Sequence, residues 1–259
     1  MAVAGIDMGA LSTKVVILEG DKVLSSATRV SGEVGEIEAR HAMDEALARA
    51  GLKLEDLKLV LSTGTGRKGI SFAQKQRTSM SCHAKGAYWL FPSARTVIDI
   101  GAESSTVIKL GADGKIEDSV GNDKCAAGTG VFLHAMSKMM RVPVEEMGPV
   151  SLKHKSKASI SSMCVIFAES EVISHVHRDP PTPKEDILAG IHESIVDRLF
   201  GMTQRIGVVP EVVLTGGVSK NLGIVRAIEE KLGHKALIPE DPQIVGALGA
   251  AIIAQQLAG

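Results

Sequence analysis

A stretch of 14 residues occurs twice in this chain, and the repeat constrains the fold more than any other feature. Residues 5–18 read GIDMGALSTKVVIL and residues 97–110 read VIDIGAESSTVIKL, at a constant offset of 92. Each copy predicts an apolar strand that ends in Asp-x-Gly, a turn of small residues and a second apolar strand. Such a repeat indicates a duplicated α/β fold. The positions that both copies share are Ile6/Ile98, Asp7/Asp99, Gly9/Gly101, Ala10/Ala102, Ser12/Ser104, Val15/Val107 and Leu18/Leu110.

Two further segments echo each other. Residues 57–67 (LKLVLSTGTGR) and residues 210–221 (PEVVLTGGVSKN) both predict an apolar strand that runs into a turn rich in threonine and glycine. Under the duplication hypothesis each half repeats one β–α–β type unit. A ligand then lies between the halves, because α/β folds commonly bind ligands in clefts at strand ends. The alternative is two unrelated strand–turn units of an α/β protein.

The repeated turn has the chemistry of a site for a polyphosphate and a metal ion. Gly9 and Gly101 let the backbone approach a ligand closely, and the N–H and hydroxyl groups of the turn can bind phosphate oxygens. Asp7 and Asp99 can hold Mg²⁺ directly or through its waters. One Asp-x-Gly hairpin would be a weak signal, since such turns are common. Two facing hairpins would bind a nucleotide from both sides.

Composition and charge narrow the class of partner. The chain has 259 residues, enough for one large domain or two ordinary ones, and its net charge of −1 gives no reason to expect nucleic acid or an anionic membrane as partner. Aromatic residues make up 3%, which argues against a stacking platform for single-stranded nucleic acid. No apolar run approaches the roughly 20 residues of a membrane-spanning helix. We find no signal-peptide pattern, and three cysteines fit a reducing cytoplasm better than a disulfide scaffold.

Local patterns predict alternating strands and helices. The last helix is rich in small and apolar residues and is expected to pack closely against the first domain. We therefore expect one lobe to comprise 1–92 plus 240–259 and the other 93–239. Strands are expected at 2–7, 14–19, 22–28, 58–62, 95–100, 105–110 and 212–215, and a hairpin turn at 111–115. Helices are expected at 34–52, 128–141, 187–206 and 243–258, with another ending at 86–90 and an exposed loop at 178–186.

Two cysteines precede predicted helices. Cys125 lies in GNDKCAAGTG and Cys164 in SISSMCVIFAESEVIS. The unpaired N–H groups and dipole of a helix favour a thiolate at its N-terminus, which suits a metal or iron–sulfur ligand. Two thiolates are too few for a [4Fe-4S] cluster, but a symmetric dimer would supply four. The alternative is that both cysteines are inert, buried small residues. Cys82 also precedes a predicted helix, and a core position is expected for it.

Motifs spread over the whole chain resemble those of a known family. GIDMGALSTK, STGTGR, SCHAKGA, VIDIGA, NDKCAAGTG, FAESEVIS, AGIH, LTGGV and GALGAA occur in this order from end to end. Together they resemble the ATPase components of the 2-hydroxyacyl-CoA dehydratase activator and benzoyl-CoA reductase family. The resemblance implies the duplicated ribonuclease-H-like fold of the actin, Hsp70 and sugar kinase superfamily, with the nucleotide in the cleft between two domains. It also implies an ATP-dependent iron–sulfur electron donor whose [4Fe-4S] cluster bridges two subunits.

The resemblance assigns roles to the cysteines and to the partners. Cys125 and Cys164 match the cluster ligands, whereas Cys82 matches a recurrent position that is not a ligand. One departure concerns Ala102-Glu103-Ser104, where the activators typically carry Gly-Gln-Asp. This resembles more closely the ATPase subunits of benzoyl-CoA reductases. The favoured partner is therefore an aroyl-CoA reductase component, with a 2-hydroxyacyl-CoA dehydratase as the alternative. The second ATPase subunit is a paralogue or a second copy, and ferredoxin or flavodoxin is the expected electron donor.

The predicted mechanism places ATP–Mg²⁺ between the lobes. Asp7 and Asp99 organise the metal ion and the attacking water. Gly216 and Gly217 let adenosine lie against the backbone, as the family resemblance also implies. For Lys14 an outward surface position is the alternative to a phosphate contact. The other residues expected to contact the nucleotide are Gly9, Ala10, Ser12, Thr13, Gly101, Ala102, Gly128 and Gly130.

The segment around Cys125 links the two predicted sites. Gly128 and Gly130 follow Cys125 directly, so the nucleotide lobe and a cluster ligand share one stretch of chain. Lobe movement driven by the nucleotide would shift the cysteine-bearing helix ends, provided that the two nucleotide states make different contacts. The sequence thus predicts that ATP hydrolysis drives a low-potential electron to the partner.

Two other classes of protein use the same phosphate cradle. A sugar or acid kinase needs a catalytic base beside a substrate pocket, and the sequence offers neither an obvious base nor a reason for paired cysteines. A nucleotide-switched binding protein like Hsp70 or actin needs no cluster and normally carries a further binding or assembly region, which we do not find. An ATP-driven electron donor is therefore favoured.

Overall fold

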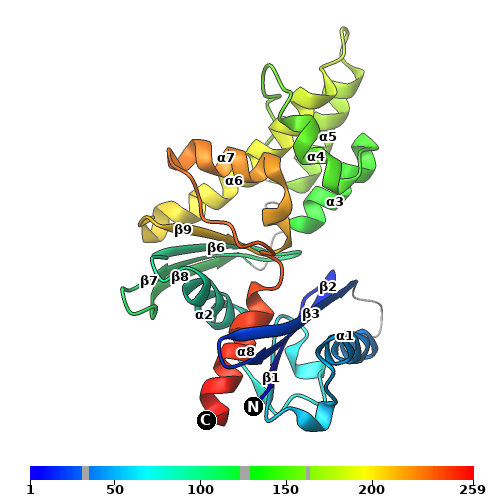
Figure 1. Ribbon diagram of the computed structural model, residues 1–259. Helices are drawn as coiled ribbons and strands as arrows, with labels where there is room; N and C mark the ends of the chain where they lie inside the picture. The colour runs from blue at the N-terminus through cyan, green and yellow to red at the C-terminus, as the bar shows by residue number, and fades with distance from the viewer. Residues whose placement is uncertain (31–34, 123–128, 162–163) are drawn as a thin grey trace.

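The computed structural model describes residues 1–30, 35–122, 129–161 and 164–259, and these contain two β-sheets of the same design (Figure 1). The strand order is β3-β2-β1-β4-β5 in the first sheet and β8-β7-β6-β9 in the second. In each sheet an antiparallel meander of three strands is joined by a parallel strand from later in the chain. The first sheet comprises β1 (Val3–Met8), β2 (Ser12–Glu19), β3 (Lys22–Val30), β4 (Val60–Thr63) and β5 (Lys75–Gln76). The second comprises β6 (Thr96–Ile100), β7 (Ser105–Leu110), β8 (Ile116–Asn122) and β9 (Val212–Thr215).

Strand register places the two halves of the duplication in equivalent positions. β1 runs parallel to β4 with Asp7 opposite Thr63, and β6 runs parallel to β9 with Asp99 opposite Thr215. The two echoing Thr-Gly segments are therefore the same strand of two equivalent units. This confirms the predicted duplicated α/β fold and contradicts the alternative of unrelated strand–turn units.

Helices cover both faces of the first sheet. Along β2, Val15 and Ile17 face the cluster that contains α1, whereas Val16 and Leu18 face α8. Successive residues of a strand point to opposite faces, so coverage on both sides explains why β2 is apolar throughout. The helices are α1 (Gly35–Ala50), α2 (Ser79–Leu90), α3 (Gly130–Met140), α4 (Val144–Ser151), α5 (Val165–His177), α6 (Lys184–Ile206), α7 (Leu222–Leu232) and α8 (Val245–Ala258). Short 3-10 turns lie at Leu54–Asp56, Arg67–Gly69 and Gly217–Lys220.

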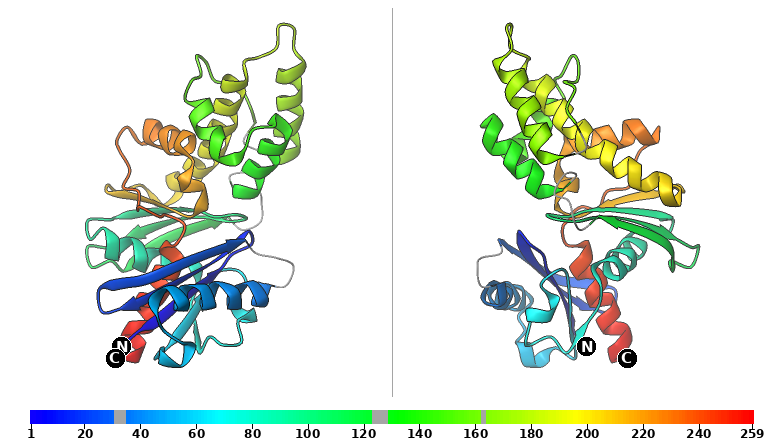
Figure 2. Two further views of the ribbon diagram at one scale, coloured as in Figure 1. Left: turned by 45° about the vertical axis from the view of Figure 1, so that its right-hand side comes forward. Right: turned by 180° about the vertical axis from the view of Figure 1, so that it is seen from behind.

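The second sheet also separates two apolar clusters. Val97 and Ile108 pack against Ala87 of α2, whereas Ile98 and Leu214 belong to the large cluster of α3, α6 and α7. The helices α4 and α5 extend this second half away from the first sheet, so that α5 lies at the end of the molecule opposite both chain termini (Figure 2). The small-residue helix α8 packs on β1, β2 and β4 of the first sheet.

Several elements differ from the sequence-based expectations. The helix that ends at Leu90 begins at Ser79, so Cys82 lies inside α2 and not before a helix. The strand β8 was not predicted, because its residues are mostly polar and partly exposed, as is common at a sheet edge. The helix α4 was not predicted either, since Pro149 lies within it and proline usually signals a helix break. Within the described residues, no helix has both the length and the apolar character needed to span a bilayer.

Candidate functional site

A cavity of about 540 Å³ lies between the two sheets, and both repeated turns line it. This volume falls in the range of small-molecule and cofactor sites. The turn after β9 and the start of α3 complete the walls. The sequence-predicted residues that line the cavity are Asp7, Gly9, Ala10, Ser12, Lys14, Asp99, Gly101, Ala102, Gly130, Gly216 and Gly217.

The first turn is closed by a backbone hydrogen bond and carries a buried lysine. The Gly9 N–H donates to the Ser12 carbonyl at 3.0 Å. Lys14 is only 9% exposed, and its Nζ lies 3.4 Å from Asp7 Oδ2 and 3.1 Å from the Ser12 carbonyl. The alternative of an outward surface lysine is therefore wrong. Thr13 is fully buried and lies outside the set of residues that line the cavity.

The second turn has the same backbone but a different electrostatic environment. The Gly101 N–H donates to the Ser104 carbonyl at 2.9 Å. Asp99 is 6% exposed, and burial raises the pKa of its carboxyl group. The imidazole of His83 counteracts this rise in pKa, the charge of Asp7 adds to it, and Lys14 and a hydrogen bond from Thr215 oppose it. The negative charges of Asp7 and Asp99 therefore interact, although the two residues belong to different sheets.

Glycines with positive φ follow both parallel strands, at Gly64 (+88°) and Gly216 (+86°). A β-carbon on Gly216 would lie 2.6 Å from Asp99 Oδ1, and one on Gly64 would collide in the same way with Asp7 Oδ1. Only glycine combines this backbone conformation with a neighbouring carboxylate at such short range. The Thr-Gly dipeptide of both echo segments is thus explained by the packing of the strand end against the aspartate.

The start of α3 is bonded to the second turn. The N–H groups of Gly130 and Val131 donate to the carbonyls of Gly101 and Ala102, at 2.9 and 2.8 Å. A change in the position of this turn would therefore be transmitted to α3. Gly128 and Cys125, which were predicted to take part in this coupling, lie outside the described residues.

The sequence analysis missed several residues of the site, among them His83, Thr215 and Gln243. His83 Nδ1 lies 3.3 Å from Asp99 Oδ1, and Thr215 Oγ1 donates to the same oxygen at 3.3 Å. Gln243 spans the cleft, because its Nε2 donates to Ser12 Oγ at 3.0 Å while its Oε1 accepts from Lys220 Nζ at 2.8 Å. The contacts of His83 and Thr215 with Asp99, and of Gln243 with Ser12, join segments far apart in the sequence, so no local pattern could have indicated them.

The two described cysteines differ in their surroundings. Cys164 is half-buried at the N-cap position of α5, as the sequence predicted. Cys82 is fully buried, and burial raises the pKa of its thiol to about 12, an effect that the neighbouring Thr63 hydroxyl partly offsets. This agrees with the core position expected for Cys82. Over the described ranges, no group of three or more histidine, cysteine, aspartate or glutamate side chains is arranged to hold a metal ion.

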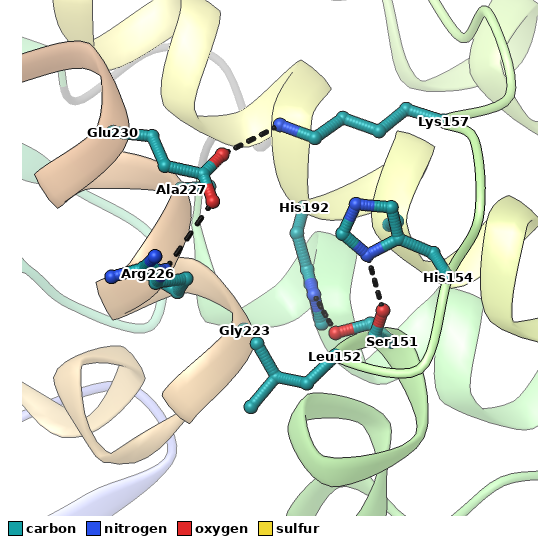
Figure 3. A pocket seen from close by; sticks show the side chains of 10 residues that line it. Ser151, Leu152, His154, Lys157, His192, Gly223, Arg226, Ala227 and Glu230 are labelled. Atoms are coloured by element: carbon teal, nitrogen blue, oxygen red, sulfur yellow. Dashed lines mark hydrogen bonds and ion pairs between the residues drawn. The ribbon is translucent and has the colours of Figure 1, made fainter.

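A second, much smaller cavity of about 20 Å³ lies among α4, α6 and α7 (Figure 3). His192 is 1% exposed there, and its Nδ1 lies 3.0 Å from Ser151 Oγ. Because Ser151 Oγ donates to the Gly148 carbonyl, it accepts from His192 Nδ1–H. Burial lowers the pKa of His192 to about 3, so this imidazole is neutral at physiological pH. The space suits one water molecule and no larger ligand.

Fold and site together define a nucleotide-binding protein of the actin, Hsp70 and sugar kinase class. A ROK family glucokinase from Streptomyces griseus shares this fold, with a TM-score of 0.59 at 14% identity over 99% of this chain and 100% of that one. The model of the BadF/BadG/BcrA/BcrD ATPase family matches residues 4–254, and the chain belongs to this family.

Relatives within the family include dehydratase activators and a component of a reductase. The activator of the 2-hydroxyisocaproyl-CoA dehydratase from Clostridium difficile, solved with bound ADPNP, has a TM-score of 0.94 and 43% identity over 100% of this chain and 96% of that one. Component A of the (R)-2-hydroxyglutaryl-CoA dehydratase from Acidaminococcus fermentans has a TM-score of 0.95 and 40% identity over 100% and 99%. A benzoyl-CoA reductase subunit from Thauera aromatica is 34% identical, with 96% of this chain and 91% of the relative covered.

Proposed function

We propose that this ATPase hydrolyses ATP–Mg²⁺ in the cleft between its sheets and thereby activates a 2-hydroxyacyl-CoA dehydratase component. The observation that carries the proposal is the pair of equivalent Asp-x-Gly turns that face one cavity from opposite sheets. The cavity is large enough for a nucleotide, and its walls combine carboxylates, a buried lysine and backbone N–H groups. These are the groups that bind Mg²⁺ and polyphosphate.

Each part of the cleft has a role in this proposal. Asp7 and Asp99 hold Mg²⁺, directly or through its waters, and orient the water that attacks the terminal phosphorus as the bond to the ADP oxygen breaks. Gly216 and Gly217 lie against adenosine. The turn residues that bind phosphate are Gly9, Ala10, Ser12, Lys14, Gly101 and Ala102, and Thr13 supports the first turn from within the core.

The relatives favour the dehydratase over the reductase as the partner system. The Ala102-Glu103-Ser104 departure favoured an aroyl-CoA reductase in the sequence analysis, with the dehydratase as the alternative. Identity to two dehydratase activators is 43% and 40%, against 34% for the benzoyl-CoA reductase component. Similarity along the whole chain is stronger support than the variation in one turn. We therefore propose the dehydratase component as the partner.

The redox part of the proposal rests on two cysteines. Cys164 at the start of α5 and Cys125, which is outside the described residues, would together hold a [4Fe-4S] cluster with the same residues of a second subunit. The half-buried position of Cys164 at a helix N-terminus fits a thiolate ligand. When bound, the cluster would supply a one-electron carrier at low potential. Ferredoxin or flavodoxin is the electron donor that we expect in the cytoplasm.

The second subunit that we propose is another copy of this chain or a paralogue, and α5 would contribute to the contact. Four large apolar side chains of α5 are exposed, with fractions from 42% to 69%. Exposed apolar residues gathered on one helix of a protein of this size indicate a surface that another protein covers. These residues are Ile166, Phe167, Ile173 and Val176.

Coupling between nucleotide and cluster requires movement between two lobes. We propose that residues 1–92 with 240–259 form one lobe and residues 93–239 the other. The bonds from Gly130 and Val131 to the second turn support a path from the nucleotide to α3. Gly128 and Gly130 would act as its hinge, next to Cys125, so that the two nucleotide states bias the cluster-bearing end differently.

The test is ATP hydrolysis by anaerobically prepared protein, with and without a candidate dehydratase component. Asp7→Asn removes a negative charge from the proposed metal site, so we expect hydrolysis to fall by about 100-fold or more, with the fold and iron content unchanged. Asp99→Asn should behave similarly. Wild-type rates in both variants would contradict the assignment of the site. Activation of an aroyl-CoA reductase, but not of a dehydratase, would instead contradict the choice of partner.

A further inference from the structure

His83 lies at a junction that the duplicated motif does not predict. Its side chain is 5% exposed, and its Nδ1 lies 3.3 Å from Asp99 Oδ1 and 3.0 Å from Thr215 Oγ1. Since Thr215 donates its hydroxyl hydrogen to Asp99 Oδ1, its oxygen accepts from His83 Nδ1–H. The three side chains therefore form a closed triangle in which His83 donates to Thr215, Thr215 donates to Asp99, and His83 Nδ1 also lies close to the same carboxylate oxygen.

The other edge of the imidazole faces the first sheet. A β-carbon on Gly246 would lie 2.8 Å from His83 Nε2 and 3.2 Å from Asp7 Oδ2. Any side chain larger than glycine at this position, in the first turn of α8, would thus enter the space between the imidazole and Asp7. His83 consequently sits between the carboxylates of both turns, and it also lines the nucleotide cleft.

The duplication is broken at this place. In the first turn Lys14 accompanies Asp7 at 3.4 Å, but the residue at the same offset in the second turn is Thr106. The nitrogen nearest the second aspartate is instead His83 Nδ1 of α2, at 3.3 Å. Two neighbouring residues of α2 therefore contact different sheets. Cys82 faces Thr63 of β4 in the first sheet, and His83 contacts Thr215 of β9 in the second.

A purely structural role does not account for an imidazole here. Thr63, the first-half counterpart of Thr215, is faced instead by the small thiol of Cys82, which belongs to an apolar core cluster. A buried imidazole costs free energy unless its polar atoms are paired, and His83 Nδ1 is paired with Thr215, which in turn donates to Asp99 of the cleft. Asp99 is buried as well, so a fixed donor determines which way its carboxylate turns.

We propose that His83 is a positioning residue of the hydrolysis reaction. Its Nδ1–H fixes the Thr215 hydroxyl, which in turn donates to Asp99 and holds the carboxylate in the orientation that the metal ion and the attacking water require. The inference rests on the proposed role of Asp99 in ATP hydrolysis. Because α2 packs chiefly on α8 and also touches β6, β7 and β9, His83 connects the orientation of Asp99 to the relative placement of the two halves.

The test distinguishes a role of the Nδ1–H group of His83 from a role of Nε2. In His83→Asn the amide N–H lies near the place of Nδ1–H, whereas in His83→Gln it reaches the place of Nε2. We expect His83→Ala and His83→Gln to lower kcat for ATP by about 100-fold, because a displaced catalytic group loses its alignment, while KM changes less than about 3-fold. His83→Asn should retain kcat within about 5-fold of the wild type. A role in folding alone would not produce this split between kcat and KM, nor rescue by asparagine only.

The matched control is Cys82→Ala, on the same helix but facing Thr63, which should leave kcat within about 2-fold of the wild-type value. Equal kcat values for the Asn and Gln variants would overturn the proposal even if the Ala variant failed to fold. An inactive Asp99→Asn variant beside a fully active His83→Ala variant would overturn the role of His83 and leave the proposed function intact. Absence of ATP hydrolysis in the wild-type protein would overturn both.

Discussion

At the scale of single residues, the two aspartates of the duplicated turn have become different. Asp7 has Lys14 at 3.4 Å, whereas Asp99 is buried beside His83 and its pKa is raised by that burial. Two carboxylates that repel each other across a small cleft favour a divalent cation between them. We therefore expect the cleft to bind the magnesium complex of a nucleotide more tightly than the free nucleotide.

The sequence contained half of this site. The Asp-x-Gly turns and their glycines could be predicted because their roles follow from local backbone geometry. The contact of His83 with Thr215 could not, because these residues are separated by 132 positions and meet only after both sheets have formed. The repeat could not indicate this contact either, because it shows only the residues that the two halves share, and His83 has no counterpart in the repeated segment.

The burial of Cys82 leads to a prediction about thiol reactivity. With its pKa raised to about 12, the Cys82 thiol is protonated at about pH 8, where alkylation requires the thiolate. In iron-free native protein we expect iodoacetamide to modify Cys82 at least about 100-fold more slowly than the half-buried Cys164. Mass spectrometry of the labelled peptides measures both rates. Denaturant should abolish the difference, and equal labelling in the native protein would contradict the core position of Cys82.

At the scale of elements, the strand and helix boundaries followed the sequence wherever burial was complete. The strands β1, β2, β6 and β9 are buried on both faces, and their apolar runs identified them. By contrast, β8 is an exposed edge strand and α4 contains Pro149, so tertiary contacts decide their structure. Gly148 of α4 packs against the start of α7, and α4 also contacts α6, so tertiary contacts support this helix.

The packing of α4, α6 and α7 around His192 leads to a prediction about acid stability. The folded-state pKa of about 3 lies below the ordinary value of 6.5, so between these values the unfolded chain takes up a proton that the folded protein does not. The contribution to stability is therefore present above pH 6.5 and is lost as the pH falls towards 3. Between about pH 7 and pH 5 we expect a loss of about 2 kcal/mol in the free energy of unfolding from this residue.

Urea unfolding at both pH values measures this loss, and His192→Asn should reduce the difference between them by a similar amount. Asparagine can still donate to Ser151 but does not titrate in this range. His41→Asn, which replaces an exposed histidine of α1, provides the matched control variant. An unaltered difference in the His192→Asn variant would show that another group dominates the acid response.

At the scale of the whole molecule, a small number of elements connect the cleft with the start of α5, where Cys164 lies. The second turn is bonded to α3, and Cys164 is the N-cap residue of α5, another helix of the same half (Figure 1). The segment before α5 is anchored on α6, because the N–H groups of Lys155 and Ser156 donate to Asp186. In the proposed coupling, a shift of the second turn would be carried through these helices to the start of α5.

The proposed cluster supplies the last prediction, because it makes iron content and subunit association depend on the same side chains. If Cys125 and Cys164 hold a [4Fe-4S] cluster between two subunits, Cys125→Ser or Cys164→Ser should remove most of the iron and weaken the dimer. Each subunit would then offer one thiolate where the cluster needs two. Iron analysis and analytical ultracentrifugation under anaerobic conditions measure both effects.

Cys82→Ser, in the core of the other half, should leave iron content almost unchanged. Full iron retention in the double variant Cys125→Ser, Cys164→Ser would exclude these ligands, and iron loss without any change in association would place the cluster within a single subunit.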